Sequence, residues 1–100
     1  MLLVRRVRGK SMEPFLYGGS IIVAKKHRTK LRVGNVVIVE HENREKIKRI
    51  VKIRSDAIYV HGDNPAFSTD SRSFGWIPKR LIVGVLLWPL HIRKSTIESH

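Results

Sequence analysis

Short apolar runs separated by turn-forming residues recur along the whole chain. Residues 36–39 are four consecutive apolar residues directly after Gly34-Asn35, and residues 21–24 form a similar run shortly after Gly18-Gly19. Runs of this length, rich in Val and Ile, suit buried strands better than surface helices. The same reasoning predicts strands at residues 2–7, 46–54, 57–61 and 83–88, the last of them ended by Pro89.

Residues 46–54 alternate, so this strand should present two different faces. One face would be mostly apolar, with Ile47, Arg49, Val51 and Ile53. The other face would carry Lys48 and Ile50 together with Lys46 and Lys52 near the strand ends. Because charged heads near strand ends reach water easily, the pattern singles out Lys48 as the lysine in the most apolar setting.

Regular short strands joined by glycine-rich turns predict an all-β fold, and we expect one small domain with a coiled, barrel-like sheet. The domain should cover residues 1–100, a length that supports one modest core. A polar hairpin turn is expected at residues 41–45 and one helical turn at residues 77–81. The polar residues 91–100 are expected to form a frayed tail.

The charge is strongly basic, with 20 Lys and Arg against 8 Asp and Glu and a net charge of +12. Such a balance is typical of proteins that contact nucleic acid or an anionic membrane surface. The basic residues are spread along the chain without a recognition helix or a row of stacking aromatics, which argues against nucleic acid and leaves a membrane surface open. A non-catalytic basic module that binds nucleic acid or anionic lipid therefore remains an alternative.

The chain has no cysteine, and its five histidines are scattered without a His-Glu-x-x-His pattern, so we expect neither a metal site nor a cofactor. Residues 1–4 are too short for the apolar part of a secretory signal. Residues 81–92 are the most apolar run, but they contain Gly84, Pro89 and His91 and fall well short of the ~20 residues that span a bilayer. We expect a cytoplasmic protein, or one peripheral to the membrane.

Residues 62–75 hold more reactive side chains than a plain loop requires. Gly62-Asp63-Asn64-Pro65 opens the stretch with four turn-forming residues. Two carboxylates, an arginine and four hydroxyl groups lie within these fourteen positions. Taken alone, the stretch is typical of a structured loop whose polar side chains bond the backbone and each other.

Three motifs occur in a fixed order: Ser11-Met12-Glu13-Pro14, then Lys48-Arg49-Ile50, then Gly62-Asp63-Asn64 with Ser68-Thr69-Asp70-Ser71-Arg72. Together they resemble the signal-peptidase-like (S26-type) serine proteases, and the resemblance runs from about residue 7 to residue 89. A compact version without a membrane anchor is similar to the proteases that trim the leader of nickel-containing superoxide dismutase. The resemblance implies a serine/lysine dyad, with Ser11 as nucleophile and Lys48 as general base.

The resemblance also implies supporting roles for other residues. Ser68 would hydrogen-bond the catalytic lysine, Asp70 and Arg72 would brace the loop, and Asp63 would be a structural acid. The oxyanion would be held by the backbone N–H of Ser11. Some relatives add a hydroxyl group two positions before the nucleophile, where this chain has Gly9, so the second donor would be absent or come from the backbone near Gly9.

A general base at this position requires a lysine with a lowered pKa. Serine is a poor nucleophile until a base takes its proton. Lys48 is a base only when neutral, so its pKa must fall from near 10.4 to about 7–8. Burial has that effect, and Ile47, Ile50 and Val51 flank Lys48 in the sequence.

The resulting interpretation is a serine endopeptidase that removes an N-terminal leader or propeptide from a precursor bound as an extended strand. A self-cleaving repressor-type (S24-like) protease is an alternative, since that group shares the fold and a similar Ser-to-Lys separation but lacks the loop motif of residues 62–75. A Ser/His/Asp triad using His41 or His61 has no support from their flanking residues. Gly9-Lys10-Ser11 is not a phosphate-binding loop, because the required leading glycine is Val4.

Overall fold

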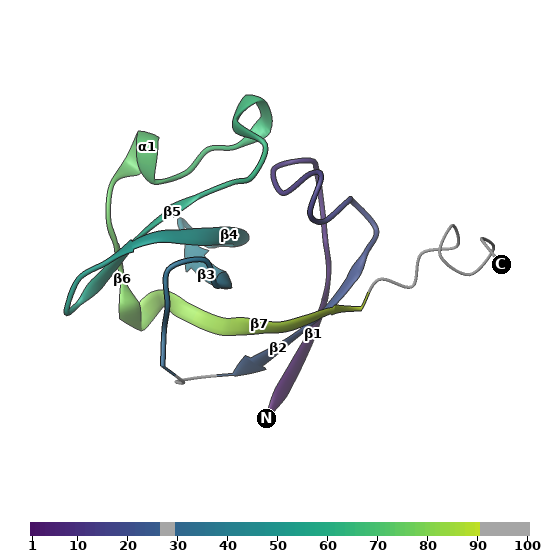
Figure 1. The fold of residues 1–100 in the computed structure, drawn as a ribbon, viewed down its shortest axis with the longest axis horizontal. Coiled ribbons are helices and arrows are strands. Elements are labelled where there is room, and N and C mark those ends of the chain that lie inside the picture. Colours follow the sequence, from purple (N-terminus) through teal and green to yellow (C-terminus); the bar gives the residue numbers. More distant parts are fainter. Residues whose placement is uncertain (27–29, 91–100) are drawn as a thin grey trace, which may run out of the picture.

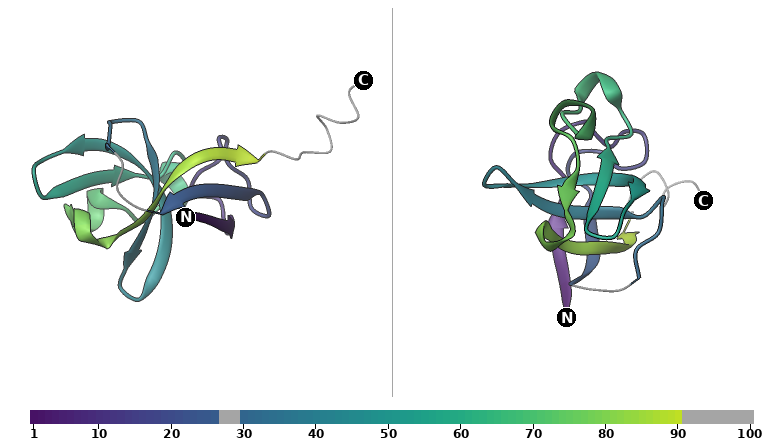
Figure 2. Two further views of the ribbon diagram at one scale, coloured as in Figure 1. Left: turned by 90° about the horizontal axis from the view of Figure 1, so that it is seen from below. Right: turned by 90° about the vertical axis from the view of Figure 1, so that its left-hand side faces the viewer.

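The computed structural model describes residues 1–26 and 30–90, and in these residues one seven-stranded sheet dominates. Every strand pairing is antiparallel, and the spatial order is β1-β2-β7-β3-β4-β5-β6. Figures 1 and 2 show that the sheet is strongly coiled rather than flat. The predicted all-β fold on a coiled sheet is confirmed. The strands are β1 (Leu2–Arg6), β2 (Ile21–Lys26), β3 (Val36–His41), β4 (Arg44–Ile53), β5 (Ala57–His61), β6 (Ile77–Pro78) and β7 (Ile82–Leu90).

The last strand, β7, lies between β2 and β3 and so joins the two halves of the sheet. It extends to Leu90, and Pro89 pairs with Ile22 of β2, so the prediction that Pro89 ends the strand is wrong. On its other side β7 pairs with β3 only through residues 82–85. Because β3 does not reach as far as Pro89, the missing N–H of the proline removes no hydrogen bond between β7 and β3.

Residues 77–81 combine a short strand with a helical turn. Ile77–Pro78 forms β6, which pairs with β5, and the 3₁₀ turn η2 (Lys79–Leu81) follows directly. The predicted tail, residues 91–100, lies outside the described residues. Within residues 1–26 and 30–90, no helix is both long enough and apolar enough to cross a bilayer.

The strand β3 is buried on both faces, because the coiled sheet has an apolar cluster on each side of it. Val36 and Ile38 belong to a cluster that also contains Ile22 and Met12. Val37 and Val39 belong to a second cluster that is completed mainly by β4, β5 and β6. A strand with two buried faces needs an unbroken apolar run, which explains the sequence Val36-Val37-Ile38-Val39.

The two faces of β4 exchange partway along the strand. A β-bulge falls between Ile50 and Lys52, so Ile50 pairs with Val60 and Lys52 already pairs with Tyr59. The extra residue at Val51 reverses the alternation, and Ile53 packs with Ile50 in the second cluster. The predicted two-face pattern therefore holds for residues 46–50 and is wrong for residues 51–53.

The β3–β4 hairpin has its turn inside the predicted segment 41–45. Glu42 and Asn43 both have positive φ angles, 55° and 63°. Two consecutive residues with positive φ are typical of the tight turns whose twist matches that of the flanking strands. The turn sets the register in which Lys48 lies opposite Val37.

Candidate active site

Lys48 is a buried lysine in the middle of β4. Only 4% of its surface is exposed, and its backbone pairs with the fully buried Val37. Its side-chain nitrogen Nζ donates a hydrogen bond to Ser68 Oγ at 2.9 Å. Burial lowers the pKa of Lys48, and the charges of Lys46 and Arg72 lower this pKa further, against the opposing effect of Asp70. Burial thus shifts Lys48 toward the neutral amine, which is the form that a general base requires.

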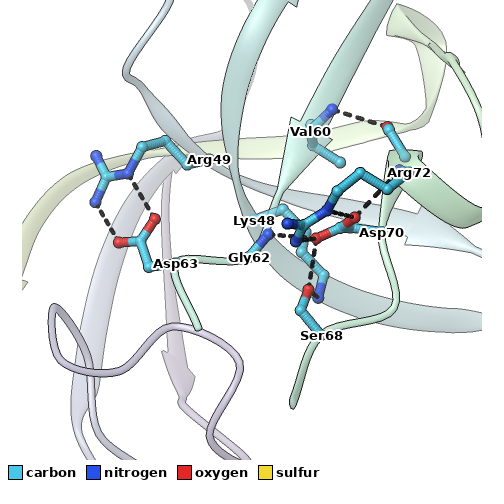
Figure 3. Close-up of polar contacts among 9 residues, drawn as sticks. Lys48, Arg49, Val60, Gly62, Asp63, Ser68, Asp70 and Arg72 are labelled. Atoms are coloured by element: carbon cyan, nitrogen blue, oxygen red, sulfur yellow. Dashed lines mark hydrogen bonds and ion pairs between the residues drawn. The ribbon is translucent and has the colours of Figure 1, made fainter. Parts of the chain in front are cut away.

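Ser68 connects Lys48 to a buried carboxylate. Ser68 Oγ donates to Asp70 Oδ2 at 2.7 Å, and the backbone N–H of Gly62 donates to the same oxygen at 2.7 Å. Arg72 holds the carboxylate from the other side, with Nε 2.9 Å from Oδ1 and a second nitrogen 2.5 Å from Oδ2. Figure 3 shows these groups converging on Asp70. The hydroxyl proton of Ser68 thus forms the hydrogen bond to Asp70, and the hydroxyl oxygen of Ser68 accepts the hydrogen bond from Lys48.

Asp70 is charged although only 1% of its surface is exposed. Burial by itself would raise the pKa of Asp70, but the hydrogen bonds from Arg72, Gly62 and Ser68 outweigh burial and hold this pKa well below its usual range. Arg72 is exposed, with 40% of its side chain accessible. The predicted pair exists, and it joins a buried carboxylate to an arginine on the surface.

A short helix that the sequence did not predict positions this pair. The helix α1 (Ser71–Phe74) begins after Asp70, whose side chain accepts a hydrogen bond from Arg72 N and so caps the helix. Ser71 is also buried, and its hydroxyl oxygen accepts from the backbone N–H of Val60 at 2.8 Å. The cap signal, an Asp before Ser-Arg-Ser, was present in the sequence, but four residues are too few to show helical periodicity.

Gly62 leaves the space in which the serine segments meet. A Cβ atom on Gly62 would lie 2.2 Å from Ser68 Oγ and 2.9 Å from the carbonyl oxygen of Ser11. Atoms cannot approach that closely, so only glycine fits between Ser68 and the segment that carries Ser11. The sequence indicated a turn at Gly62, and its second role as a spacer emerges only from the structure.

Asp63, predicted to be structural, has a specific partner that the sequence analysis did not assign. Arg49 forms two hydrogen bonds to its carboxylate, at 2.9 and 2.8 Å, and a third to the carbonyl oxygen of Gly34 at 2.8 Å. Next to Asp63, the backbone N–H of Asn64 donates to the carbonyl oxygen of Ser11 at 2.8 Å. The residue after Lys48 therefore anchors the loop that holds the backbone of Ser11. Figure 3 shows the two bonds between Arg49 and Asp63.

The segment around Ser11 is fixed by its apolar neighbours. Met12 and Leu16 are buried in the first cluster, and Leu16 N donates to Met12 O at 2.9 Å. Ser11 and Lys48 line the same cleft, whose volume is about 700 Å³, and Gly9 lines it as well. Among the residues that the structure describes, neither the hydroxyl nor the backbone N–H of Ser11 forms a hydrogen bond, and Lys48 bonds Ser68 rather than Ser11.

The structure joins four of the predicted site residues directly and holds Asp63 in a separate pair with Arg49. Lys48, Ser68, Asp70 and Arg72 form one hydrogen-bonded chain, and Ser11 faces the cleft that Lys48 also lines, without a direct bond between them. Catalytic hydrogen bonds are often formed only when substrate is bound.

Within the described part of the chain, no three His, Cys, Asp or Glu side chains are grouped in a way that would hold a metal ion.

The unequal burial of Asp70 and Arg72 predicts unequal losses of stability. We expect Asp70→Ala to lower the free energy of unfolding by about 3 kcal/mol, since the buried N–H of Gly62 and the half-buried hydroxyl of Ser68 lose their acceptor. Arg72→Ala should lower it by about half as much, because Asp70 keeps its other donors. Urea denaturation measures both values, with the exposed Arg80→Ala as control. Equal effects of all three variants would contradict this account.

The same network predicts how the loss depends on pH. The folded pKa of Asp70 is lowered, so its contribution to stability is present above the unfolded pKa of about 4. It is lost as the pH falls from there toward the folded pKa. The difference in stability between wild type and Asp70→Ala should therefore be full at neutral pH and shrink below about pH 4.

Comparison with known proteins assigns the chain to a family of peptidases. Residues 2–80 match the family model described as peptidase S24-like. The chain is also 31% identical over 109 residues to the mitochondrial ATP-independent inner membrane protease subunit 1b of Arabidopsis thaliana, an alignment that covers 80% of this chain. The chain spans 64% of the length of that relative. Because the family model covers most of the chain, including the segments of Ser11, Lys48 and Asp70, the chain belongs to the peptidase S24-like family, within the S24/S26 superfamily.

Proposed function

We propose that this protein is a serine-type endopeptidase with Ser11 as nucleophile and Lys48 as general base. The observation that carries the proposal is the setting of Lys48: a lysine with a lowered pKa, 4% exposed, on the wall of a cleft that Ser11 also lines. A surface lysine that contributes only to solubility would extend its charged group into water. The family assignment adds independent support for a peptidase.

In the proposed reaction, Ser11 Oγ attacks the carbonyl carbon of the scissile bond, and its proton passes to the neutral Nζ of Lys48. Lys48 then gives this proton to the leaving amine, and an acyl-enzyme on Ser11 remains. Lys48 next takes a proton from water, which attacks the ester carbon, and Lys48 then gives this proton to Ser11 Oγ as the ester bond breaks and the acid product leaves. The backbone N–H of Ser11 is the proposed donor to the oxyanion.

Ser68 acts in this scheme as a positioning residue. A neutral amine has two hydrogens and one lone pair. Lys48 donates one hydrogen to Ser68 Oγ, and Ser68 cannot rotate away while it donates to Asp70. This arrangement restrains the lysine head and leaves its lone pair for the proton of Ser11. Asp70, Arg72 and Gly62 support Ser68 from outside the cleft lining.

We further propose that the substrate is the leader or propeptide of a precursor protein, bound in extended form. β1 is an edge strand of the sheet, and Arg5 and Arg6 at its end line the cleft. An extended peptide can add to such an edge through backbone hydrogen bonds. The motifs of the chain are similar to those of leader-trimming proteases, including those for nickel-containing superoxide dismutase, which makes such leaders the first substrates to test.

Cleavage itself is tested by incubating the protein with synthetic leader peptides that have small residues before the cut and identifying the products by mass spectrometry. We expect cleavage at defined bonds by the wild type and none by Ser11→Ala. Absence of cleavage of every leader and of a random peptide library would overturn the proposal.

The pH dependence of the rate gives a second test. Because the pKa of Lys48 is lowered, kcat/KM should rise with pH through an apparent pKa below the 10.4 of free lysine and then reach a plateau. Charging the buried lysine at lower pH also costs stability, so the folded state should gain stability as the pH rises from the folded pKa toward the unfolded one. A rate that climbs without a plateau to about pH 10 would show an unperturbed lysine.

Cleavage of the chain by itself is a second candidate, favoured by the match to the S24-like model. The mass of the intact protein, followed over days at a pH above the apparent pKa, separates the two cases. A new fragment that appears at a rate independent of protein concentration would show self-cleavage. A constant mass, together with cleavage of added peptides, would show action on other chains.

A further inference from the structure

Seven of the sixteen residues that line the cleft shared by Ser11 and Lys48 are basic. They come from the end of β1, from the loop that follows it and from the start of β4. Figure 1 shows the loop after β1 and the segment after β5 at the same end of the molecule. Besides Lys48, the basic residues that line the cleft are Arg5, Arg6, Arg8, Lys10, Arg44 and Lys46.

The acidic side chains of the cleft are already neutralised. In the described part of the chain they are Glu42 and Glu45. Glu45 forms two hydrogen bonds to Arg5, at 2.7 and 3.0 Å. Glu42 lies 3.5 Å from Lys46. The carboxylates within residues 1–26 and 30–90 thus form no ion pair with the other cations of the cleft.

Three arginines remain available to a ligand. Arg6, Arg8 and Arg44 are exposed, and none of them forms an ion pair with another described residue. Scattered surface arginines are common and need no ligand, but these three line one cleft together with Ser11. Arg8 precedes Ser11 by three residues, so their Cα atoms are at most roughly 11 Å apart.

We propose that the cleft selects peptides that carry Asp or Glu within about three residues of the scissile bond, with Arg6, Arg8 and Arg44 as the residues that recognise the carboxylates. The distance follows from the rise of an extended peptide, about 3.4 Å per residue, against the reach from Ser11 to Arg8. Arginine binds carboxylates through two parallel hydrogen bonds, which gives recognition as well as attraction. The proposal rests on the peptidase function above and names its substrate class.

A peptide fits the cleft better than a single-stranded nucleic acid does. Proteins that bind such strands without sequence preference combine positive charge with several aromatic side chains on which successive bases stack. Among the described residues that line the cleft, Phe67 is the aromatic one, and Lys10 already lies over its ring at 5.2 Å. The cleft offers charge and a nucleophile without a row of stacking surfaces.

The experiment is a digest of a random peptide library with every cut bond identified by mass spectrometry. For the wild type we expect Asp and Glu to be enriched about fivefold within three positions of the cut, an effect that weakens as NaCl is raised from 50 to 300 mM. Arg8→Glu and Arg44→Glu should each reduce this enrichment and favour peptides with Lys or Arg there. Arg80→Glu, which makes the same charge change at an exposed position outside the cleft lining, should behave as the wild type.

The possible failures are distinguishable. Cleavage without acidic enrichment overturns this inference and leaves the peptidase function standing. If the wild type cuts no peptide, the peptidase function fails, and binding decides the inference. The probes are then a fluorescent glutamate-containing decapeptide, the same peptide with glutamine, and a ten-residue oligouridylate. At least fivefold tighter binding of the glutamate peptide than of either other probe supports acidic-peptide recognition, and equal or weaker binding overturns it.

Discussion

Ser11→Ala and Lys48→Met are each expected to lower kcat/KM by about 1,000-fold or more while leaving the fold intact. Ser11 supplies the attacking oxygen, and Lys48 is the base that activates it, so neither step proceeds without both groups. Met matches Lys48 in length and keeps its buried position apolar. Steady-state kinetics on a cleaved leader peptide measure the loss, and circular dichroism checks the fold.

Two companion variants make this prediction sharper. Lys48→Arg keeps a cation with hydrogen-bond donors, but a guanidinium does not lose its proton, so this variant should be as inactive as Lys48→Met. The double variant Ser11→Ala/Lys48→Met should be no worse than either single change, because the two groups act as one unit. Substantial activity in Lys48→Met or Lys48→Arg at neutral pH would remove Lys48 from the mechanism.

Gly62→Ala is expected to damage both the site and the fold. The added methyl group would lie 2.2 Å from Ser68 Oγ and 2.6 Å from Ser68 Cβ, so Ser68 must move and release Lys48 and Asp70. We expect kcat/KM to fall by about 100-fold, and the free energy of unfolding to fall by about 1–3 kcal/mol, as for other overpacked sites. Thermal unfolding should show a Tm lower by several degrees.

A double-mutant cycle with Ser68→Gly isolates the cause. Ser68→Gly alone should fold but lose activity, since Lys48 loses its positioning partner. In that background, Gly62→Ala should destabilise less than in the wild type, because the Ser68 side chain is gone, although the carbonyl oxygen of Ser11 still lies 2.9 Å from the added methyl group. If Gly62→Ala destabilises both backgrounds equally, the clash with Ser68 is not the reason for the glycine.

The environment of Lys48 shows where local sequence reasoning stops. Its neighbours in the chain, Ile47 and Ile50, suggested an apolar setting, but Ile47 packs against the first cluster, on the opposite face of the sheet. The face of Lys48 carries Ile50 from its own strand, and Lys48 pairs with the fully buried Val37 of β3; both of these residues belong to the second cluster. Side chains that alternate along a strand depend on cross-strand partners more than on chain neighbours.

Arg49 and Gly62 show the same limit within the site. The sequence marked both as members of motifs, but nothing local connects Arg49 with Asp63, fourteen positions away, or Gly62 with the backbone of Ser11. Such contacts depend on how two loops fold over a sheet. Ser68, Asp70 and Arg72 were easier to predict as a unit, because they are close in the chain and bond one another directly.

The sequence by itself determined the all-β class, the approximate position of six of the seven strands and the candidate residues, because alternation, apolar runs and turn residues act over a few positions. Only the tertiary structure decided that β7 lies between β2 and β3, that a bulge at Val51 turns Ile53 inward, and that Ser11 shares a cleft with Lys48. The reason is physical: strand order, bulges and clefts depend on which distant segments together bury the most apolar surface, and no short stretch of sequence specifies that choice.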